Sequence, residues 1–204
     1  MGKLSITTFV SLDGVMQGPG GPEEDRRDGF DLGGWTVPYA DDDFGHFMDS
    51  VFGRVGAFLL GRRTYEIFAG FWPTVTDPDD PIASKLNSRP KYVVSTTMER
   101  ADWEPSTIIR GDLAQEIPAL KERTDGEVQV HGSGRLAHSL LEHDLIDTLH
   151  VLTYPVVLGK GLRLFPEGAV PTAFRHTDAR ITGSGVTIQT YELAGRPEYG
   201  TYGA

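Results

Sequence analysis

Short runs of alternating or continuously apolar residues recur along the chain, and such runs are typical of β-strands. In Lys3–Val10, every second side chain from Leu4 onward is expected to share one face. The last two predicted strands flank the turn Gly183-Ser184 and should pair as an antiparallel hairpin. Eight strands are predicted: Lys3–Val10, Val55–Leu60, Lys91–Ser95, Ser106–Ile109, Glu127–His131, Leu145–Leu152, Ala173–Thr182 and Gly185–Leu193.

Segments with apolar residues at helical spacing separate most of these strands. A helix is predicted to begin near Asp41–Asp43, because acidic side chains suit the positive end of a helix dipole and apolar residues follow at helical intervals. Further helices are predicted at Arg63–Gly70, Asp112–Arg123 and Ser133–Leu141. Strands that alternate with helices predict an α/β fold with a mostly parallel central sheet, to which the C-terminal hairpin adds antiparallel strands.

Three stretches are expected to lack regular structure. Gly18–Gly34 is a long polar loop, and loops of this length are usually functional or disordered. We expect it to close over a bound ligand as a lid. Pro73–Asp80 is a second, turn-rich loop. Residues 1–194 are expected to form one domain and residues 195–204 a frayed, flexible tail.

The composition excludes several classes of protein. The 204 residues carry a formal net charge of −10 and include no cysteine, which rules out disulfide scaffolds, thiolate zinc sites and cysteine nucleophiles. The acidic balance argues against general nucleic-acid binding. No apolar run is long enough for a membrane span, and no secretory signal is evident, so a cytoplasmic protein with a small-molecule partner is expected. No histidine pair has metal-site spacing, and no metal is expected.

Three short motifs could bind phosphate groups, and each has a purely structural alternative. Gly132–Ala137 follows a predicted strand and fits G-x-G-x-x-A, in which glycines let the backbone approach a pyrophosphate at a helix start; the alternative is a tight turn without a ligand. Gly61–Thr64 places two guanidinium groups and a hydroxyl at a helix start, or forms an ordinary helix start with solvated arginines. Ser95–Thr97 puts hydroxyls at a strand end, or forms a polar turn.

The three motifs share one geometry, because each lies where a strand gives way to a loop or a helix. If the strands are parallel, all three lie at one edge of the sheet, where ligands bind in open α/β folds. Together they indicate a dinucleotide site. Two arginines near a ribose favour a 2′-phosphate, and hence NADPH over NADH.

The order of the motifs along the chain resembles a known family. These are SLDG, GGWTVPYADDD, LLGRRTYEIF, KYVVSTT, VHGSGRL and LHVLTYPVVLGKG. The set resembles the dihydrofolate reductase-like fold and, more closely, the C-terminal reductase domain of bacterial riboflavin-biosynthesis deaminase/reductase proteins, over about residues 3–193. The resemblance implies a central, mostly parallel sheet of about eight strands, bound NADPH and a homodimer.

The resemblance also implies roles for individual residues. Trp35 and Pro38 keep the spacing of a substrate-binding motif of dihydrofolate reductases, although the acids follow one residue later than in that motif, from Asp41. Thr153 matches a substrate-side threonine, and Asp13 ends the first strand, where the family places substrate and nicotinamide. The residues implied in NADPH binding are Gly61, Arg62, Arg63, Thr64, Ser95, Thr96, Gly132, Ser133, Gly134, Arg135 and Leu136. A cis bond between Gly132 and Ser133 would match the glycine pair of dihydrofolate reductases.

Two hypotheses about function follow. The first is an NADPH-dependent oxidoreductase that reduces a small pterin- or pyrimidine-like heterocycle or a carbonyl compound. In it, Asp41 and Asp13 would be the catalytic residues, and Asp41 would protonate or bind the substrate with a raised pKa. The second is a dinucleotide- or ligand-binding homodimer of the same fold without reductase activity. Without a substrate, the acids from Asp41 are simply a helix start and Asp13 is a turn residue.

Overall fold

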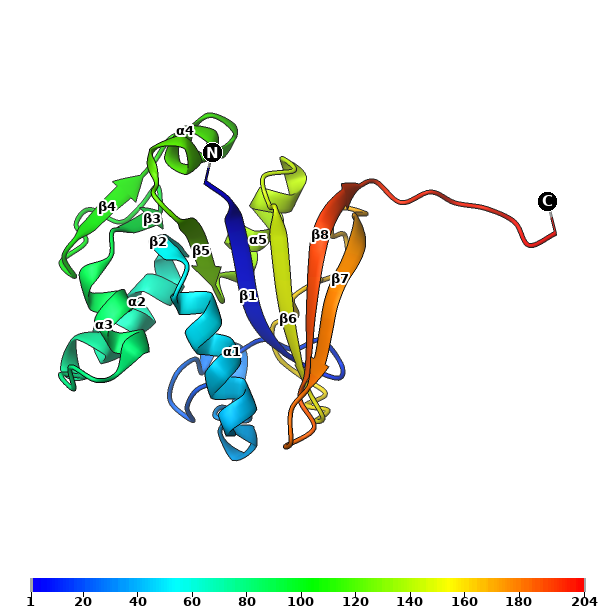
Figure 1. Cartoon of the computed structure of the whole chain (residues 1–204), viewed down its shortest axis with the longest axis horizontal. Helices are drawn as coiled ribbons and strands as arrows, with labels where there is room; N and C mark the ends of the chain where they lie inside the picture. The colour runs from blue at the N-terminus through cyan, green and yellow to red at the C-terminus, as the bar shows by residue number, and fades with distance from the viewer. Residues whose placement is uncertain (1, 204) are drawn as a thin grey trace.

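The computed structural model describes residues 2–203, and an eight-stranded mixed sheet forms its centre (Figure 1). The strands lie in the order β4-β3-β2-β5-β1-β6-β8-β7. All neighbours from β4 to β6 pair in parallel, whereas β8 pairs antiparallel with both β6 and β7. The strands are β1 (Leu4–Ser11), β2 (Val55–Gly61), β3 (Lys91–Val94), β4 (Ser106–Ile109), β5 (Glu127–His131), β6 (Thr148–Tyr154), β7 (Ala173–Ile181) and β8 (Thr187–Gly195). The predicted fold class is therefore confirmed.

Five α-helices cover the sheet in two layers. In Figure 1, α1 lies in front of the sheet and α5 behind it. The helices are α1 (Asp42–Phe52), α2 (Arg62–Phe71), α3 (Pro81–Ser88), α4 (Leu113–Arg123) and α5 (Gly134–Glu142). Side chains of α1, α2 and α3 enter one hydrophobic cluster, and those of α4 and α5 enter a second cluster on the other face. β1 lies between these clusters and is buried along nearly all its length, as expected of an interior parallel strand.

Aspartates begin three of the five helices. The Asp41 carboxylate accepts a hydrogen bond from the Phe44 amide at 2.8 Å, at the start of α1. The Asp80 carboxylate likewise accepts hydrogen bonds from amides in the first turn of α3, and the Asp112 carboxylate accepts one from an amide in the first turn of α4. A carboxylate at this position pairs one of the free amide groups of the first helical turn and also suits the helix dipole.

Three features differ from the sequence predictions. Helix α3 was not predicted, although Asp80 and Pro81 are typical of a helix start. Strand β6 begins three residues later than predicted, because Leu145 and Ile146 lie in the irregular segment between α5 and β6. Strand β8 runs to Gly195, and residues 196–203 then lead away from the body of the protein (Figure 1). Residue 204 of the predicted tail lies outside the described residues.

Candidate functional site

The three phosphate-binding motifs lie at one edge of the sheet, as the parallel arrangement requires. Strands β3, β2 and β5 are direct neighbours and all run in the same direction. The segments that leave their carboxyl ends are Ser95–Thr97, Arg62–Thr64 and Gly132–Gly134. The spatial part of the prediction is thus confirmed: residues as far as 72 positions apart in sequence meet at the position where open α/β folds bind ligands.

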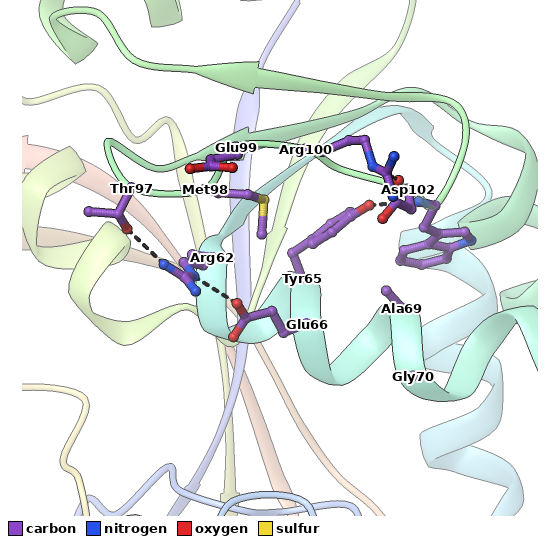
Figure 2. Close-up of a pocket in the computed structure, with 11 residues that line it drawn as sticks. Arg62, Tyr65, Glu66, Ala69, Gly70, Thr97, Met98, Glu99, Arg100 and Asp102 are labelled. Atoms are coloured by element: carbon purple, nitrogen blue, oxygen red, sulfur yellow. Dashed lines mark hydrogen bonds and ion pairs between the residues drawn. The ribbon is translucent and has the colours of Figure 1, made fainter.

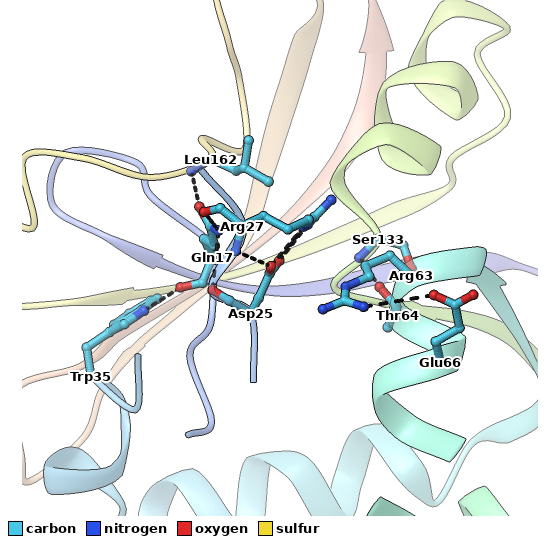
Figure 3. Close-up of polar contacts among 9 residues, drawn as sticks. All are labelled: Gln17, Asp25, Arg27, Trp35, Arg63, Thr64, Glu66, Ser133 and Leu162. Atoms are coloured by element: carbon cyan, nitrogen blue, oxygen red, sulfur yellow. Dashed lines mark hydrogen bonds and ion pairs between the residues drawn. The ribbon is translucent and has the colours of Figure 1, made fainter. Parts of the chain in front are cut away.

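Hydrogen bonds join the Gly61–Thr64 motif directly to the Gly132–Ala137 motif. The Gly61 amide donates to the Ser133 hydroxyl at 3.1 Å. The Ser133 amide donates to the Thr64 hydroxyl at 3.1 Å, and Figure 3 shows these two residues side by side. The Ser133 hydroxyl in turn donates to the His131 carbonyl at 3.2 Å. These bonds hold the starts of α2 and α5 against each other.

Both of these helix starts lack a side-chain cap. Gly61 precedes α2 and Ser133 precedes α5, and neither residue's side chain caps its helix. The first amide groups of a helix have no partner within the helix, and they carry the positive end of its dipole. Two helix starts of this kind beside each other therefore form a surface suited to an anion.

The turn before α5 has an unusual backbone. Gly132 and Ser133 both have φ in the left-handed region, at 59° and 55°. For a residue with a side chain this conformation costs roughly 1–2 kcal/mol. Such strain often marks a functional site. The cis bond between these two residues, which the resemblance suggested, does not form: the two positive φ angles shape the turn instead.

The arginines of the second motif have an acidic neighbour. Arg62 Nε donates to Glu66 Oε1 at 2.7 Å, and Arg62 Nη1 donates to the Thr97 hydroxyl at 2.8 Å (Figure 2). Arg63 Nη1 lies 3.9 Å from Glu66 Oε2. An open depression of about 630 Å³ begins at Arg62 and Thr97 and continues along α2.

The predicted cofactor-binding residues of the Ser95–Thr97 motif and of the start of α5 differ in their exposure. The Ser95 hydroxyl accepts from the amides of Met98 and Thr97, at 2.9 and 3.3 Å, and is buried. It therefore shapes the turn after β3. Thr96 is exposed, as is Arg135 at the start of α5, while Leu136 is buried in the core. Of these four residues, Thr96 and Arg135 are the ones whose side chains are open to a ligand.

Asp41 has the structural role that was its alternative interpretation. Besides capping α1, its carboxylate accepts from the Ser184 amide at 2.8 Å, which ties α1 to the turn between β7 and β8. The hydrogen bonds from Phe44 and Ser184 lower the pKa of Asp41 to about 2. The expected raised pKa is therefore wrong, because the carboxylate faces amide donors instead of an apolar cleft.

Asp13 is likewise engaged by its own chain. Its carboxylate accepts from the Ser11 hydroxyl at 2.7 Å and from the amides of Leu158 and Gly159 at 3.0 and 2.9 Å. These bonds lower the pKa of Asp13 to about 2. Asp13 thus fastens the end of β1 to the loop after β6 and, like Asp41, holds no proton to donate near neutral pH.

An aromatic cluster occupies the substrate side predicted from Trp35, Pro38 and Thr153. Trp35 is buried, and its ring lies edge-on to Tyr154 with centroids 5.3 Å apart. Phe9 also packs edge-on against Tyr154, at 5.9 Å. Thr153 is half-buried on β6, and Pro38 is exposed in a short 3₁₀ turn. Sequence reasoning missed Tyr154 as the centre of this cluster, because its predicted strand ended two residues earlier.

The long loop Gly18–Gly34 is tied down at the residue that precedes it. The Gln17 side chain accepts a hydrogen bond from the Leu162 amide at 2.9 Å and donates one to the Arg27 carbonyl at 3.1 Å (Figure 3). The backbone carbonyl of Gln17 accepts one from Trp35 Nε1 at 2.8 Å. Within the loop, Asp25 is buried and ion-paired with Arg27. Burial raises the pKa of Asp25, but the hydrogen bonds from Arg27 outweigh it and leave the pKa lowered.

Neither metal-binding nor membrane-spanning features were found in the described part of the chain. Across residues 2–203, the His, Asp and Glu side chains form no group of three or more suited to a metal ion. Within the same residues, none of the helices has the length and apolar character that a bilayer span requires.

Comparison with known proteins agrees with this geometry. The sheet order and the joined loops define a dihydrofolate reductase-like α/β protein. The sequence profile described as "RibD C-terminal domain" matches residues 2–188, and the chain belongs to this family. It is 24% identical over 195 residues to the uncharacterized protein YyaP of Bacillus subtilis, covering 95% of this chain and 96% of YyaP.

Two solved structures share the fold. A putative riboflavin biosynthesis protein from Shewanella sp. PV-4 superposes with a TM-score of 0.67 at 21% identity, covering 95% of this chain and 99% of the other. Dihydrofolate reductase from Enterococcus faecalis, solved with NADP(H), superposes with a TM-score of 0.58 at 16% identity, covering 94% and 96%. The resemblance predicted from the motifs, to the dihydrofolate reductase-like fold and to the reductase domain of riboflavin biosynthesis, is confirmed.

Proposed function

We propose that this protein is an NADPH-dependent reductase of a small pterin- or pyrimidine-like heterocycle or a carbonyl compound. The observation that carries the proposal is the meeting of two uncapped helix starts, those of α2 and α5, at the carboxyl edge of a parallel sheet. The family membership and the dihydrofolate reductase fold support the same conclusion.

The residues present fit a dinucleotide with two phosphate regions. The pyrophosphate would lie against the amides of Gly134, Arg135 and Leu136, beside the strained turn of Gly132 and Ser133. Gly61 and Thr64 would support it from α2, through the bonds to Ser133. The adenosine side, with its 2′-phosphate, would face Arg62, Arg63 and Thr96, on the turn that buried Ser95 shapes. When bound, the nicotinamide supplies the hydride.

The remaining parts of the site orient the substrate. Trp35, Thr153 and Pro38 would border the substrate, with the aromatic cluster around Tyr154 as an apolar wall. The loop held by Gln17 would exclude water. Asp13 and Asp41 fix the surrounding loops in place and are not proton donors, because hydrogen bonds keep their pKa values near 2. The substrate-side proton would come from another source, such as water.

A dinucleotide titration tests the proposal. Nicotinamide fluorescence would be followed while NADPH or NADH is added to the wild type, Arg62→Ala, Arg63→Ala and the control Arg175→Ala. Arg175 is an exposed arginine on β7, near the opposite end of the sheet. We expect NADPH to bind, with at least one of the two site variants weakening it about tenfold and the control leaving it unchanged.

Absence of binding by either nucleotide would contradict the proposal. Binding of NADPH without its consumption, across a screen of pterins, pyrimidines and carbonyl compounds, would favour the second candidate, a ligand-binding protein that keeps the family fold. A homodimer and a cytoplasmic location are further parts of the proposal. Light scattering of the purified protein tests the dimer.

A further inference from the structure

A carboxylate lies beside Arg62 and Arg63, the two residues that form the arginine corner of the proposed dinucleotide site. Glu66, one helical turn into α2, forms an ion pair with Arg62 at 2.7 Å and lies 3.9 Å from Arg63. It is about one-third exposed, as its side chain retains 36% of its accessible surface. Exposed ion pairs between residues three or four apart on a helix contribute little to stability. The position of Glu66 at this corner therefore matters more for the ligand than for the fold.

The contacts of Arg62 are divided between two partners. Glu66 accepts from Nε, along one side of the guanidinium, and Thr97 accepts from Nη1. A guanidinium has five N–H donors, so three remain free for a ligand. Glu66 and Thr97 together hold the side chain in one orientation, which reduces the conformational entropy that a ligand must overcome.

The same carboxylate lowers the positive charge of the corner. Two guanidinium groups carry two positive charges, and Glu66 cancels one of them. A 2′-phosphate gains from positive charge, whereas a carboxylate is the usual acceptor for the 2′-hydroxyl of NADH. A corner that contains both kinds of group should therefore discriminate less between the two nucleotides than a pair of arginines alone.

We propose that Glu66 sets the coenzyme selectivity of this protein by limiting its preference for NADPH over NADH. The inference rests on the proposed function, since it concerns the same dinucleotide site. Glu66 acts through Arg62 and Arg63 and through its charge, so it is a positioning and selectivity residue.

The test is the ratio of the dissociation constants for NADH and NADPH in matched variants. Glu66→Gln keeps a hydrogen-bond acceptor for Arg62 but removes the negative charge. We expect it to bind NADPH about fivefold more tightly and to change NADH binding less than twofold, with a steeper dependence of NADPH binding on salt. Thr97→Val, which removes the second contact of Arg62, should weaken NADPH binding and leave NADH binding nearly unchanged.

Two controls separate selectivity from general effects. Glu122→Gln makes the same charge change at an exposed position on α4 and should leave the ratio unchanged. A purely structural role of Glu66 would lower the melting temperature and weaken both nucleotides alike. If Glu66→Gln still binds both nucleotides, but its ratio of the NADH to the NADPH dissociation constant is unchanged or smaller than that of the wild type, the inference is overturned. The proposed function would then still stand. Failure of every variant and the wild type to bind either nucleotide would overturn both.

Discussion

Two buried histidines should make this fold sensitive to mild acid. His131 on β5 and His150 on β6 both align with Thr7 on β1, on the sheet face that α1 covers. His131 stacks on Phe52 of α1 at 4.8 Å, and His150 packs edge-on against Phe47 at 5.6 Å. Burial lowers the pKa of His131 to about 3 and that of His150 to about 4, from an ordinary value of 6.5.

The sign and size of the effect follow from these pKa values. Both histidines are neutral in the folded protein, whereas in the unfolded chain they take up a proton near pH 6.5. The stability that depends on their neutral form is therefore complete above about pH 7 and is lost as the pH falls toward the folded-state values. Between pH 7.5 and pH 5.0, each histidine should remove about 2 kcal/mol from the free energy of unfolding.

Other titrating groups contribute equally to the pH dependence of each variant, so their contributions cancel when variants are compared. The pKa values of Asp13 and Asp41 are also lowered, to about 2, but their contribution to stability is lost only below about pH 5. A small domain has a total stability of roughly 5–15 kcal/mol, so a loss of about 4 kcal/mol from the two histidines would be readily measured.

The assay is urea unfolding, followed by tryptophan fluorescence, at pH 7.5 and pH 5.0. We expect the pH-dependent loss to be about 2 kcal/mol smaller in His150→Gln and in His131→Gln than in the wild type, whatever the absolute stability of each variant. His46→Gln, at an exposed position on α1, is the control for removing a histidine from the surface. A wild-type loss below about 1 kcal/mol, or equal losses in the wild type and both buried-site variants, would refute the reasoning.

Three further outcomes are expected. Asp80→Ala removes the cap of α3 and should lower the free energy of unfolding by about 1 kcal/mol in urea, with an unchanged m-value; no loss would mean that the cap is dispensable. Lys121→Ala should cost about 2 kcal/mol by the same assay, because it removes a buried lysine from its ion pair with the partly exposed Asp147, which keeps only its hydrogen bond from the Leu4 amide; a cost below about 1 kcal/mol would contradict this. Gly134→Val should weaken NADPH binding clearly while changing the melting temperature little, because a Cβ at Gly134 would lie 2.7 Å from the Met16 sulfur, beside the proposed pyrophosphate position. If the variant bound NADPH as tightly as the wild type, the result would count against that position.

The sequence predicts four of the parallel strands closely. The predicted β2, β3, β4 and β5 match the structure to within one residue, because a short apolar run between turn signals has few other interpretations. The start of β6 was misplaced because Ile146 is apolar and buried, yet it lies in the irregular segment before the strand. Helix α3 was missed because eight residues with few apolar positions give a weak periodic signal.

The chemistry of Asp13 and Asp41 depends on both local and distant partners. The largest contributions to their lowered pKa values come from near neighbours, the Ser11 hydroxyl for Asp13 and the Phe44 amide for Asp41. Further amides come from Leu158 and Gly159, about 145 residues from Asp13, and from Ser184, 143 residues from Asp41. Local sequence can suggest the first kind of partner, but only the fold brings the second kind near.

The candidate site shows the same division between local and distant information. The contrast between capped and uncapped helices is only partly visible in the sequence. Aspartates precede α1, α3 and α4, and Gly61, which has no side chain, precedes α2. Ser133 before α5 is a residue type that commonly caps helices, but its hydroxyl contacts Gly61 and His131 instead. What the sequence does not show is that the two uncapped starts touch. They do so because β2 and β5 are neighbours in the sheet, although β3 and β4 lie between them in the chain. A lone uncapped helix start is weak evidence for a ligand. Two that are bonded to each other through Ser133 and Thr64 form one surface suited to an anion, and this pairing supports the proposed dinucleotide site more strongly than either motif does alone.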